Sequence, residues 1–388
     1  MDAAEKLPEP GGAPAPAPPH ADSERGGTLT VDLDAVAANW RALVSRVVTA
    51  DCAAVVKSDA YGLGLEQIAG KLAATGCKTF FVADIAEAKR LRASALEATV
   101  YVLDGLPPQG AAAITELNAR PVINSMTELA EWDAFVAANK WQGGAAVHVD
   151  TGMNRLGISA EEAAALAPRV QNVNHGITLL MSHLACAETP DHPLNFNQIR
   201  LFRELRTLYH GVPASLANSS GIFLGDSTHH DVVRPGAALY GINPTAGRHN
   251  PMRPAVELTA RVLQVRAVEH GESVGYGATW TAKRASRIAV VALGYADGLL
   301  RAASGSDRAR GGTAIIHGKV CPIAGRISMD LACIDITDLP EGVVRRGDRA
   351  TFIGGKLAID DLAAAAGTIG YELLTSLGRS CQRVYRGG

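Results

Sequence analysis

Two patterns of apolar residues alternate along the chain between residues 28 and 245. Short apolar runs are separated by longer stretches in which apolar positions recur at helical spacing. The first helix is predicted at 35–48, after the acidic residues Asp32 and Asp34. The apolar runs predicted to form strands lie at 53–56, 79–82, 99–103, 120–123, 145–149, 176–180, 213–216 and, with the weakest pattern, 231–233.

Strands that alternate with helices indicate βαβ units and a parallel sheet. Eight such units over about 210 residues match the size of a (β/α)8 barrel of the TIM type. The fold class predicted for this region is therefore α/β. Spacing does not show that the sheet closes on itself, so an open doubly wound sheet is the alternative.

The pattern changes after the segment YGINP at 240–244. Between residues 255 and 352 the helical period mostly disappears, and β-branched runs at 262–265, 288–291, 313–316 and 333–336 are separated by Gly, Asp and Pro. One helix is predicted at 359–366. We therefore predict a disordered tail rich in Pro and Ala at 1–27, a barrel at 28–245 and a mainly β domain at 246–388, with residues 28–31 pairing with this second domain.

Composition and charge exclude several function classes. The chain has 388 residues, 47% of them hydrophobic, which is enough for a sizeable core. Lys+Arg 37 against Asp+Glu 39, without a long basic run, argues against a nucleic-acid partner. No apolar stretch approaches the roughly 18 residues of a membrane span. Six scattered cysteines and an N-terminus without an export signal predict a cytoplasmic protein without a cysteine-based zinc site.

Candidate chemistry gathers at the ends of the predicted strands, which share one face of a parallel barrel. These residues are Lys57 after the first strand, Arg155 after the fifth, His183 after the sixth, Asn218 and Ser219 after the seventh, and Arg234-Pro235-Gly236 after the last. The set has no carboxylate cluster for a divalent metal, and Ser219 does not lie in a GxSxG motif. Cations and backbone N–H groups suit an anionic ligand such as phosphate, and a lysine leaving an apolar strand is a Schiff-base candidate. Each residue alone has an ordinary structural interpretation, so the convergence carries the prediction.

The segment AVVKSDAYGLG at 54–64 resembles the cofactor-lysine motif of alanine racemases, the pyridoxal 5'-phosphate (PLP) enzymes built on a barrel. Further motifs of that family follow in order over residues 28–380: VDTGMNRLG at 149–157, SHLA at 182–185, ANS at 217–219, RPG at 234–236, VGYGATW at 274–280, GYADG at 294–298, GRISMD at 325–330 and YELL at 371–374.

The resemblance implies a role for each matching residue. Lys57 would form the Schiff base with PLP and move a proton on one face of the substrate Cα, and Tyr276 of the partner subunit would act on the other face. The phosphate would be held by Tyr61, Ser219, Gly236 and Tyr371, with Asn218 also in the cofactor site. His183 would lie beside the pyridine ring and Arg234 would donate to its nitrogen. The substrate would meet Arg155, Tyr295 and the Met329 N–H, with Asp330 in support.

One position departs from the family pattern. Many members have a carbamylated lysine where this chain has His148, and that lysine orients the arginine corresponding to Arg155. Histidine cannot carry a stable carbamate of that kind. A water, a bound anion or another polar group is therefore expected to position Arg155.

The resemblance implies an alanine racemase that interconverts L-alanine and D-alanine, supplies D-alanine for peptidoglycan and forms a homodimer with shared active sites. A racemase of broader specificity is the nearest alternative. A decarboxylase of the same domain plan is less favoured, because its cysteine-centred motif is missing from the second domain. A PLP-homeostasis protein would use a lone barrel, which the predicted second domain argues against.

Overall fold

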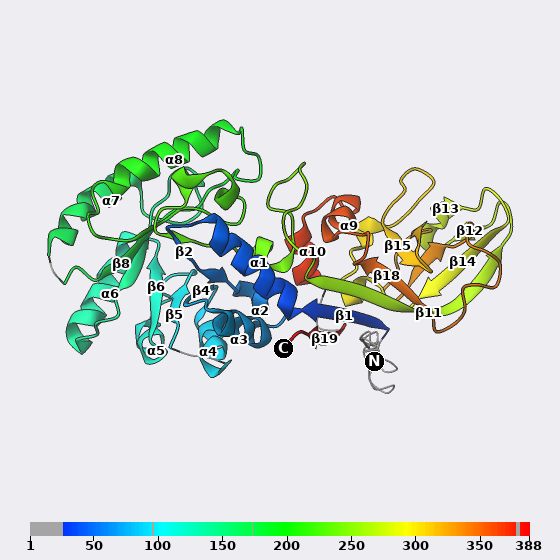
Figure 1. Cartoon of the computed structure of the whole chain (residues 1–388), viewed down its shortest axis with the longest axis horizontal. Coiled ribbons are helices and arrows are strands. Elements are labelled where there is room, and N and C mark those ends of the chain that lie inside the picture. Colours follow the sequence, from blue (N-terminus) through cyan, green and yellow to red (C-terminus); the bar gives the residue numbers. More distant parts are fainter. Residues whose placement is uncertain (1–25, 95–96, 173, 378–380) are drawn as a thin grey trace, which may run out of the picture.

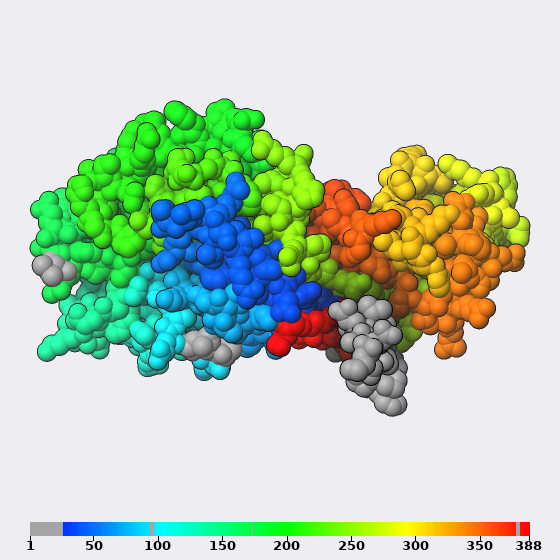
Figure 2. All heavy atoms as spheres, in the orientation of Figure 1, coloured from blue at the N-terminus to red at the C-terminus, as the bar shows by residue number. Residues whose placement is uncertain are grey.

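The chain folds into two lobes joined by a narrower middle (Figures 1 and 2). The computed structural model describes residues 26–94, 97–172, 174–377 and 381–388. All of the predicted tail except Gly26 and Gly27 lies outside these residues. Within the described ranges, no helix combines the length and apolar character needed to cross a membrane.

The first lobe is built on parallel strands that follow one another in sequence order. Each strand pairs with the next, from β3 to β9, and every pairing is parallel. The strands are β2 (Asp51–Cys52), β3 (Ala54–Val55), β4 (Thr79–Val82), β5 (Thr99–Val102), β6 (Ala119–Ile123), β7 (Ala145–His148), β8 (Ile177–Met181), β9 (Ala214–Ser215) and β10 (Val232–Val233).

Strand β10 closes this sheet into a barrel. It pairs in parallel with β2 on one side. The Val55 N–H donates to Pro235 O at 2.9 Å, and on the other side the Arg234 N–H donates to Ala217 O at 2.9 Å. Strand β10 corresponds to the predicted run at 231–233, which has the weakest sequence pattern. Its contacts on both sides exclude the open sheet and confirm the predicted barrel.

Helices surround the barrel strands (Figure 1). The first begins at Leu33, two residues before its predicted start, because the Asp32 side chain accepts the Ala35 N–H at 2.8 Å and caps it. The helices are α1 (Leu33–Arg46), α2 (Lys57–Tyr61), α3 (Leu65–Thr75), α4 (Ile85–Ser94), α5 (Ala111–Glu116), α6 (Met126–Asn139), α7 (Ala160–Leu166) and α8 (Pro193–Arg206), with short 3-10 turns η2 (Ala167–Gln171), η3 (Gly221–Phe223), η4 (Asp226–Thr228) and η5 (Ala237–Tyr240).

Apolar side chains from successive barrel strands form a separate buried cluster. Phe81 and Tyr101, from neighbouring strands, stack with ring centroids 5.0 Å apart. The cluster consists of Ala53, Val55, Phe81, Tyr101, Val122, Ala146, Leu179 and Met181. A filled interior leaves the strand ends, rather than a central pore, as the place for chemistry.

The second lobe is mainly β. Strand β1 lies between β11, to which it is antiparallel, and β19, to which it is parallel, so residues 28–31 pair with strands of this lobe. The strands are β1 (Gly27–Asp32), β11 (Val256–Val268), β12 (Ser273–Val274), β13 (Trp280–Thr281), β14 (Ser286–Val291), β15 (Thr313–Ile316), β16 (Lys319–Pro322), β17 (Ala332–Asp335), β18 (Arg349–Ile353) and β19 (Gln382–Arg386), with helices α9 (Ile359–Ala365) and α10 (Gly370–Ser376) and 3-10 turns η6 (Tyr276–Ala278), η7 (Tyr295–Asp297) and η8 (Arg301–Ala303).

The sequence pattern identified parts of β11, β14, β15 and β17 but not the other strands that follow them in this lobe. The helix predicted at 359–366 is α9, whereas α10 and strands β12, β13, β16, β18 and β19 had no prediction. The sequence of strand β19, QRVYR, has no apolar run, and none of its residues is fully buried. Pairing with β1 at the other end of the chain makes it a strand.

Candidate active site

Lys57 lies two residues beyond the end of β3, at the start of a strained turn. The four residues that follow it have left-handed φ values between 52° and 58°: Ser58, Asp59, Ala60 and Tyr61. The Gly62 N–H closes the turn on Ser58 O at 2.8 Å. A left-handed conformation costs a residue with a side chain roughly 1–2 kcal/mol. The face of the barrel at which its strands end is called the barrel mouth. Strain of this kind, directly after a lysine at the barrel mouth, is typical of a functional site.

The environment of Lys57 favours its neutral amine. Burial lowers the pKa of Lys57, and the charge of Arg155 lowers it further. The carboxylates of Asp104 and Glu87 act in the opposite direction but do not reverse the shift. A lysine with a lowered pKa is a better nucleophile toward an aldehyde or ketone. The predicted role of Lys57 is chemically reasonable at this position.

Arg234 is a fixed cation among the strand ends. Its side chain is buried, with only 4% of the residue exposed. Nη1 donates to Ser215 Oγ and Nη2 donates to Ser182 O, both at 2.5 Å. Burial lowers the pKa of Arg234 to about 10, so the guanidinium keeps its charge at neutral pH. It can therefore donate hydrogen bonds but cannot accept a proton.

Two histidines near this cation are neutral. Burial, followed by the charges of Arg234 and Arg155, lowers the pKa of His183 well below its usual value. The loop of His183 is held by Gln198, whose Nε2 donates to His183 O at 2.8 Å. Burial also lowers the pKa of His148 to about 4, with a further contribution from Arg234. Neither imidazole carries a charge at neutral pH.

The tautomer of His148 is set by Asn124. His148 Nδ1 lies 2.8 Å from Asn124 Oδ1, and Asn124 Nδ2 donates to Val122 O at 2.9 Å. Because the amide nitrogen is used as a donor, Asn124 Oδ1 accepts and His148 Nδ1 carries the proton. His148 Nε2 is then a hydrogen-bond acceptor. How Arg155 is positioned stays a prediction, with this acceptor as one available polar group.

The loops after β9 and β10 form a cradle of backbone N–H groups. Ser219 Oγ accepts the N–H groups of Gly236 at 3.0 Å and Ala238 at 3.1 Å. A Cβ on Gly236 would lie only 2.4 Å from Tyr61 Oη, so glycine is the residue that leaves room there. Tyr61 packs against Tyr240 with ring centroids 4.9 Å apart. Hydroxyls and N–H groups of this kind suit a phosphate.

Two further predicted cofactor residues lie at the edge of this cradle. Tyr371 is on α10, half exposed, and its electrostatic interaction with Tyr61 contributes to raising the pKa of Tyr61 after burial, the larger cause. Asn218 Oδ1 accepts the N–H of Gly221, the first residue of η3, at 2.8 Å. A contact between Asn218 and a cofactor stays a prediction.

The remaining predicted residues lie on the second lobe and are exposed. Tyr276 is in η6, between β12 and β13, with 68% of the residue exposed. Figure 1 shows this hairpin at the end of the second lobe that is farthest from the barrel. Tyr295 and Met329 are 41% and 54% exposed, and the Ala296 N–H donates to Met329 O at 2.9 Å, which joins their loops. Asp330 is exposed beside them. Within one chain, the hairpin that carries Tyr276 therefore lies away from the barrel.

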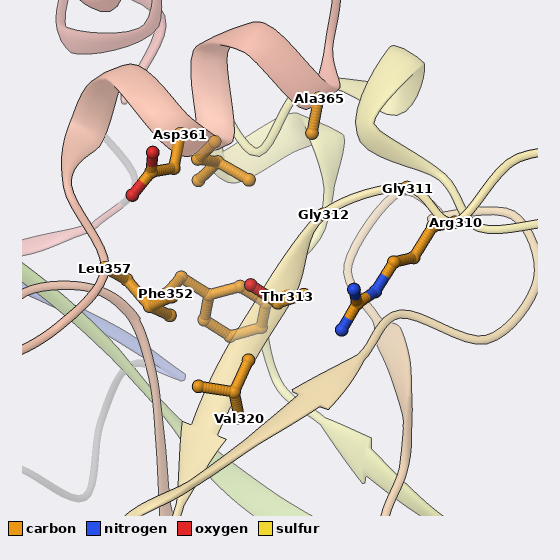
Figure 3. A pocket seen from close by; sticks show the side chains of 10 residues that line it. Arg310, Gly311, Gly312, Thr313, Val320, Phe352, Leu357, Asp361 and Ala365 are labelled. Carbon is orange, nitrogen blue, oxygen red and sulfur yellow. The ribbon is translucent and has the colours of Figure 1, made fainter.

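A cavity of about 290 Å³ lies inside the second lobe, between α9 and strands β15, β16 and β18 (Figure 3). Phe352, Leu357 and Leu362 give it apolar walls, and Arg310 and Asp361 contribute opposite charges. It contains none of the residues predicted for the site. The candidate chemistry therefore belongs to the barrel mouth rather than to this cavity.

The sequence analysis missed the residues that hydrogen-bond the candidate side chains or their loops. Asn124, Ser215 and Gln198 support His148, Arg234 and His183 respectively. A signal existed for Ser215, which interrupts the apolar run 213–216, and for Asn124, which directly follows β6. Gln198 is fully buried on α8, but nothing in its sequence context indicates a partner after β8.

Comparison with known proteins covers almost the whole described chain. The models "Alanine racemase, N-terminal domain" and "Alanine racemase, C-terminal domain" match residues 31–244 and 255–385. Alanine racemase from Methylobacterium sp. (strain 4-46) is 50% identical over 365 residues, which cover 94% of this chain and 99% of the relative.

Solved structures of alanine racemases have the same fold as this chain. Alanine racemase from Bartonella henselae with covalently bound pyridoxal phosphate has a TM-score of 0.87 at 36% identity, covering 93% of this chain and 99% of its own. Biosynthetic alanine racemase from Pseudomonas aeruginosa has a TM-score of 0.86 at 35% identity, covering 94% of this chain and 100% of its own. The chain therefore belongs to the alanine racemase family, whose members are isomerases that depend on pyridoxal 5'-phosphate.

Proposed function

We propose that this protein interconverts L-alanine and D-alanine with PLP as cofactor. The observation that supports this most directly is the grouping of Lys57, His183 and the buried Arg234 at the mouth of one barrel, in a chain half identical to an alanine racemase. Bound PLP supplies an electron sink for the negative charge that develops when the substrate Cα loses its proton.

The residues present fit this cofactor. The amine of Lys57, with its lowered pKa, would hold the cofactor aldehyde. Gly236 leaves space for a phosphate beside Tyr61, and Ser219 and Tyr371 add hydroxyl groups. His183 would lie beside the ring, and Asn218 completes the proposed cofactor residues.

Arg234 favours racemisation over side reactions. A guanidinium beside the pyridine nitrogen would donate a hydrogen bond without protonating it, since arginine is not deprotonated in proteins. The ring is then a weaker electron sink than one facing a carboxylate. Arg234 would thereby favour return of the proton to the substrate Cα over its transfer elsewhere.

Inversion needs two proton-transferring groups on opposite faces of Cα, because one group returning the proton to its original face gives no inversion. We assign one face to Lys57 and the other to Tyr276 of the partner subunit. The exposure of Tyr276 on the far lobe supports a homodimer in which each active site combines two chains.

The substrate residues follow the same arrangement. Arg155, at the barrel mouth, would bind the substrate carboxylate together with the Met329 N–H. Tyr295 would narrow the entrance, and Asp330 would support the groups of the second lobe. Six cysteines scattered along the sequence support a reducing cytoplasm, where D-alanine would serve peptidoglycan synthesis.

Substrate incubation tests the proposed reaction. Purified protein saturated with PLP is incubated with L-alanine, L-serine and larger L-amino acids, and the D-enantiomers are separated by chiral chromatography. Rapid formation of D-alanine with slow turnover of the others is expected. Equal rates on larger amino acids would favour a broad-specificity racemase, and loss of CO₂ would favour a decarboxylase. Binding of PLP without turnover would favour a homeostasis protein.

Mixed dimers test the shared site. The variants Lys57→Ala and Tyr276→Phe are each expected to lose about 10²- to 10⁴-fold or more in rate. Unfolded and refolded together, they form some dimers in which one site has both native residues, with about a quarter of the wild-type activity for random pairing. No recovery on mixing, although each variant binds PLP, would show that both residues act within one chain or that Tyr276 has no role.

A further inference from the structure

Asp59 ties the strained turn α2 to three other elements. Its Oδ1 accepts the Leu65 N–H at 3.0 Å and Arg90 Nη2 at 2.6 Å, and its Oδ2 accepts Arg383 Nη1 at 2.8 Å. The Asp59 N–H donates to Glu87 Oε1 at 2.8 Å. Hydrogen bonds from α3, α4 and β19 therefore meet on one residue of the turn.

The last strand of the chain holds this segment at two points. Arg383, 324 residues from Asp59 in sequence, pairs with its carboxylate. Tyr385 lies two positions further along β19, on the same side of the strand, and its hydroxyl donates to Leu63 O at 3.0 Å. A Cβ on Gly64 would lie 2.1 Å from that hydroxyl. The close contact leaves the turn little room to relax.

The carboxylate of Asp59 is ionised where these contacts are made. Burial acts to raise the pKa of Asp59, but the hydrogen bonds from Arg90, Leu65 and Arg383 outweigh it and lower the pKa. Backbone in a sparsely populated conformation persists only when its surroundings fix it from several directions. The ion pairs supply that constraint in a segment whose own preference is for right-handed backbone.

We propose that Asp59 and Arg383 are positioning residues for Lys57. By holding the left-handed turn, they fix the Lys57 amine relative to the Tyr61 hydroxyl, which lies at the other end of the same turn. The inference rests on the proposed function, because these two groups matter together only if they bind one cofactor. Strand β19, at the end of the chain, then contributes to the geometry of the cofactor site in the barrel.

Substitutions of the pair test this. Arg383→Gln and Asp59→Asn each remove a charge-assisted bond, worth about tenfold to a hundredfold in an equilibrium. We expect the dissociation constant for PLP, titrated into cofactor-free protein by visible absorbance, to rise about tenfold or more. We expect kcat to fall while KM for alanine changes little, because the turn carries no predicted substrate residue. Arg383→Lys, which keeps the charge, should restore most of the affinity.

Matched controls separate positioning from general damage. Arg386 lies on the other face of β19, with its nearest carboxylate oxygen on Glu257 at 4.0 Å, and Arg386→Gln should leave PLP affinity unchanged. The double variant Asp59→Asn/Arg383→Gln should be no worse than the more affected single variant. Amide hydrogen exchange should accelerate at residues 59–65 in Arg383→Gln with little change in thermal midpoint.

Each contrary result overturns a defined claim. Native PLP affinity and kcat in Arg383→Gln, in a wild type that binds PLP and racemises alanine, would refute the positioning role. Equal losses in Arg386→Gln and Arg383→Gln would show that strand integrity, not the Asp59 contact, matters. A wild type that fails to bind PLP would instead refute the proposed function.

Discussion

The predicted site has two halves that differ in burial. One half lies at the barrel mouth and is buried, whereas the other lies on the second lobe and is exposed. At the mouth, Arg234 is 4% exposed and held by Ser215 and Ser182. On the second lobe, Tyr276 is 68% exposed and its hydroxyl makes no hydrogen bond within the described part of the chain. One half is assembled by the fold of a single chain, whereas the other presents side chains that only association would bury.

The difference concerns how each half becomes ordered. A buried group such as Arg234 loses its water and its side-chain freedom when the chain folds, so these free-energy costs do not arise again on binding. The group is therefore preorganised for a ligand. An exposed tyrosine must lose rotamer freedom and water when a partner arrives. Removing a mouth residue should therefore affect stability as well as chemistry, whereas removing Tyr276 should affect chemistry alone.

The largest effect is expected for the residue at the centre of the mouth. Lys57→Ala removes the amine that would hold the cofactor and move a proton, so the rate of D-alanine formation should fall by about 10⁴-fold or more. Chiral chromatography measures the rate, and visible absorbance measures cofactor retention. Lys356→Ala, at an exposed lysine of the second lobe, is the control and should behave as wild type. A Lys57→Ala protein that keeps its rate contradicts the assignment of the mouth as the active site.

Arg234 should contribute strongly to stability. Arg234→Met leaves Ser182 O and the Ser215 hydroxyl without their buried donor, so the free energy of unfolding should fall by about 4 kcal/mol. Urea unfolding of cofactor-free protein at fixed concentration measures this, so that lost PLP binding does not add to the difference. Arg200→Met removes an exposed ion pair with Glu204 on α8 and should cost no more than about 0.5 kcal/mol. Equal losses in the two variants would refute the contrast in preorganisation.

His148 should make the mouth sensitive to acid. Its pKa is about 4 in the folded protein and 6.5 in an unfolded chain, because burial and Arg234 disfavour the cation while Asp150 partly opposes them. Between these pH values the unfolded state takes up a proton that the folded state does not, so stability is complete above pH 6.5 and falls as the pH drops toward 4. The full loss is about 3 kcal/mol.

The variant His148→Gln isolates this contribution, because its amide does not titrate. Urea unfolding at neutral pH and near pH 5 should show a smaller acid-induced loss in the variant than in wild type, by about 2 kcal/mol. His183 titrates in both proteins, so only its electrostatic coupling to His148 remains in the difference. Identical pH dependence in the two proteins would mean that His148 is not buried as a neutral imidazole.

The smallest effect is expected on the exposed face. Tyr276→Phe should change the free energy of unfolding of the cofactor-free protein by no more than about 0.5 kcal/mol, because its hydroxyl is not used within the described part of the chain. The same urea titration measures it. A loss comparable to that of Arg234→Met would show that Tyr276 is already part of a packed structure, and the comparison between the two regions would fail.

Sequence predicted the positions of the chemical groups better than their surroundings. Lys57 and Arg234 were found because each follows an apolar run, and strand ends of a parallel barrel meet on one face. The left-handed turn after Lys57 had no signal, because only its glycines favour positive φ and the four residues before Gly62 do not. The support from Gln198 and Arg383 was equally hidden, since each acts on a residue of a different element.

The sequence by itself determined the alternation of strands and helices in the barrel, the change to a mainly β lobe, and the motifs that resemble the alanine racemase family. These features depend on local periodicity and residue type. The tertiary structure decided the closure of the barrel by β10, the neutral state of His148 and the ion pair between β19 and the turn that follows Lys57. Each of these depends on burial or on hydrogen bonds between residues distant in sequence, which a one-dimensional pattern does not contain.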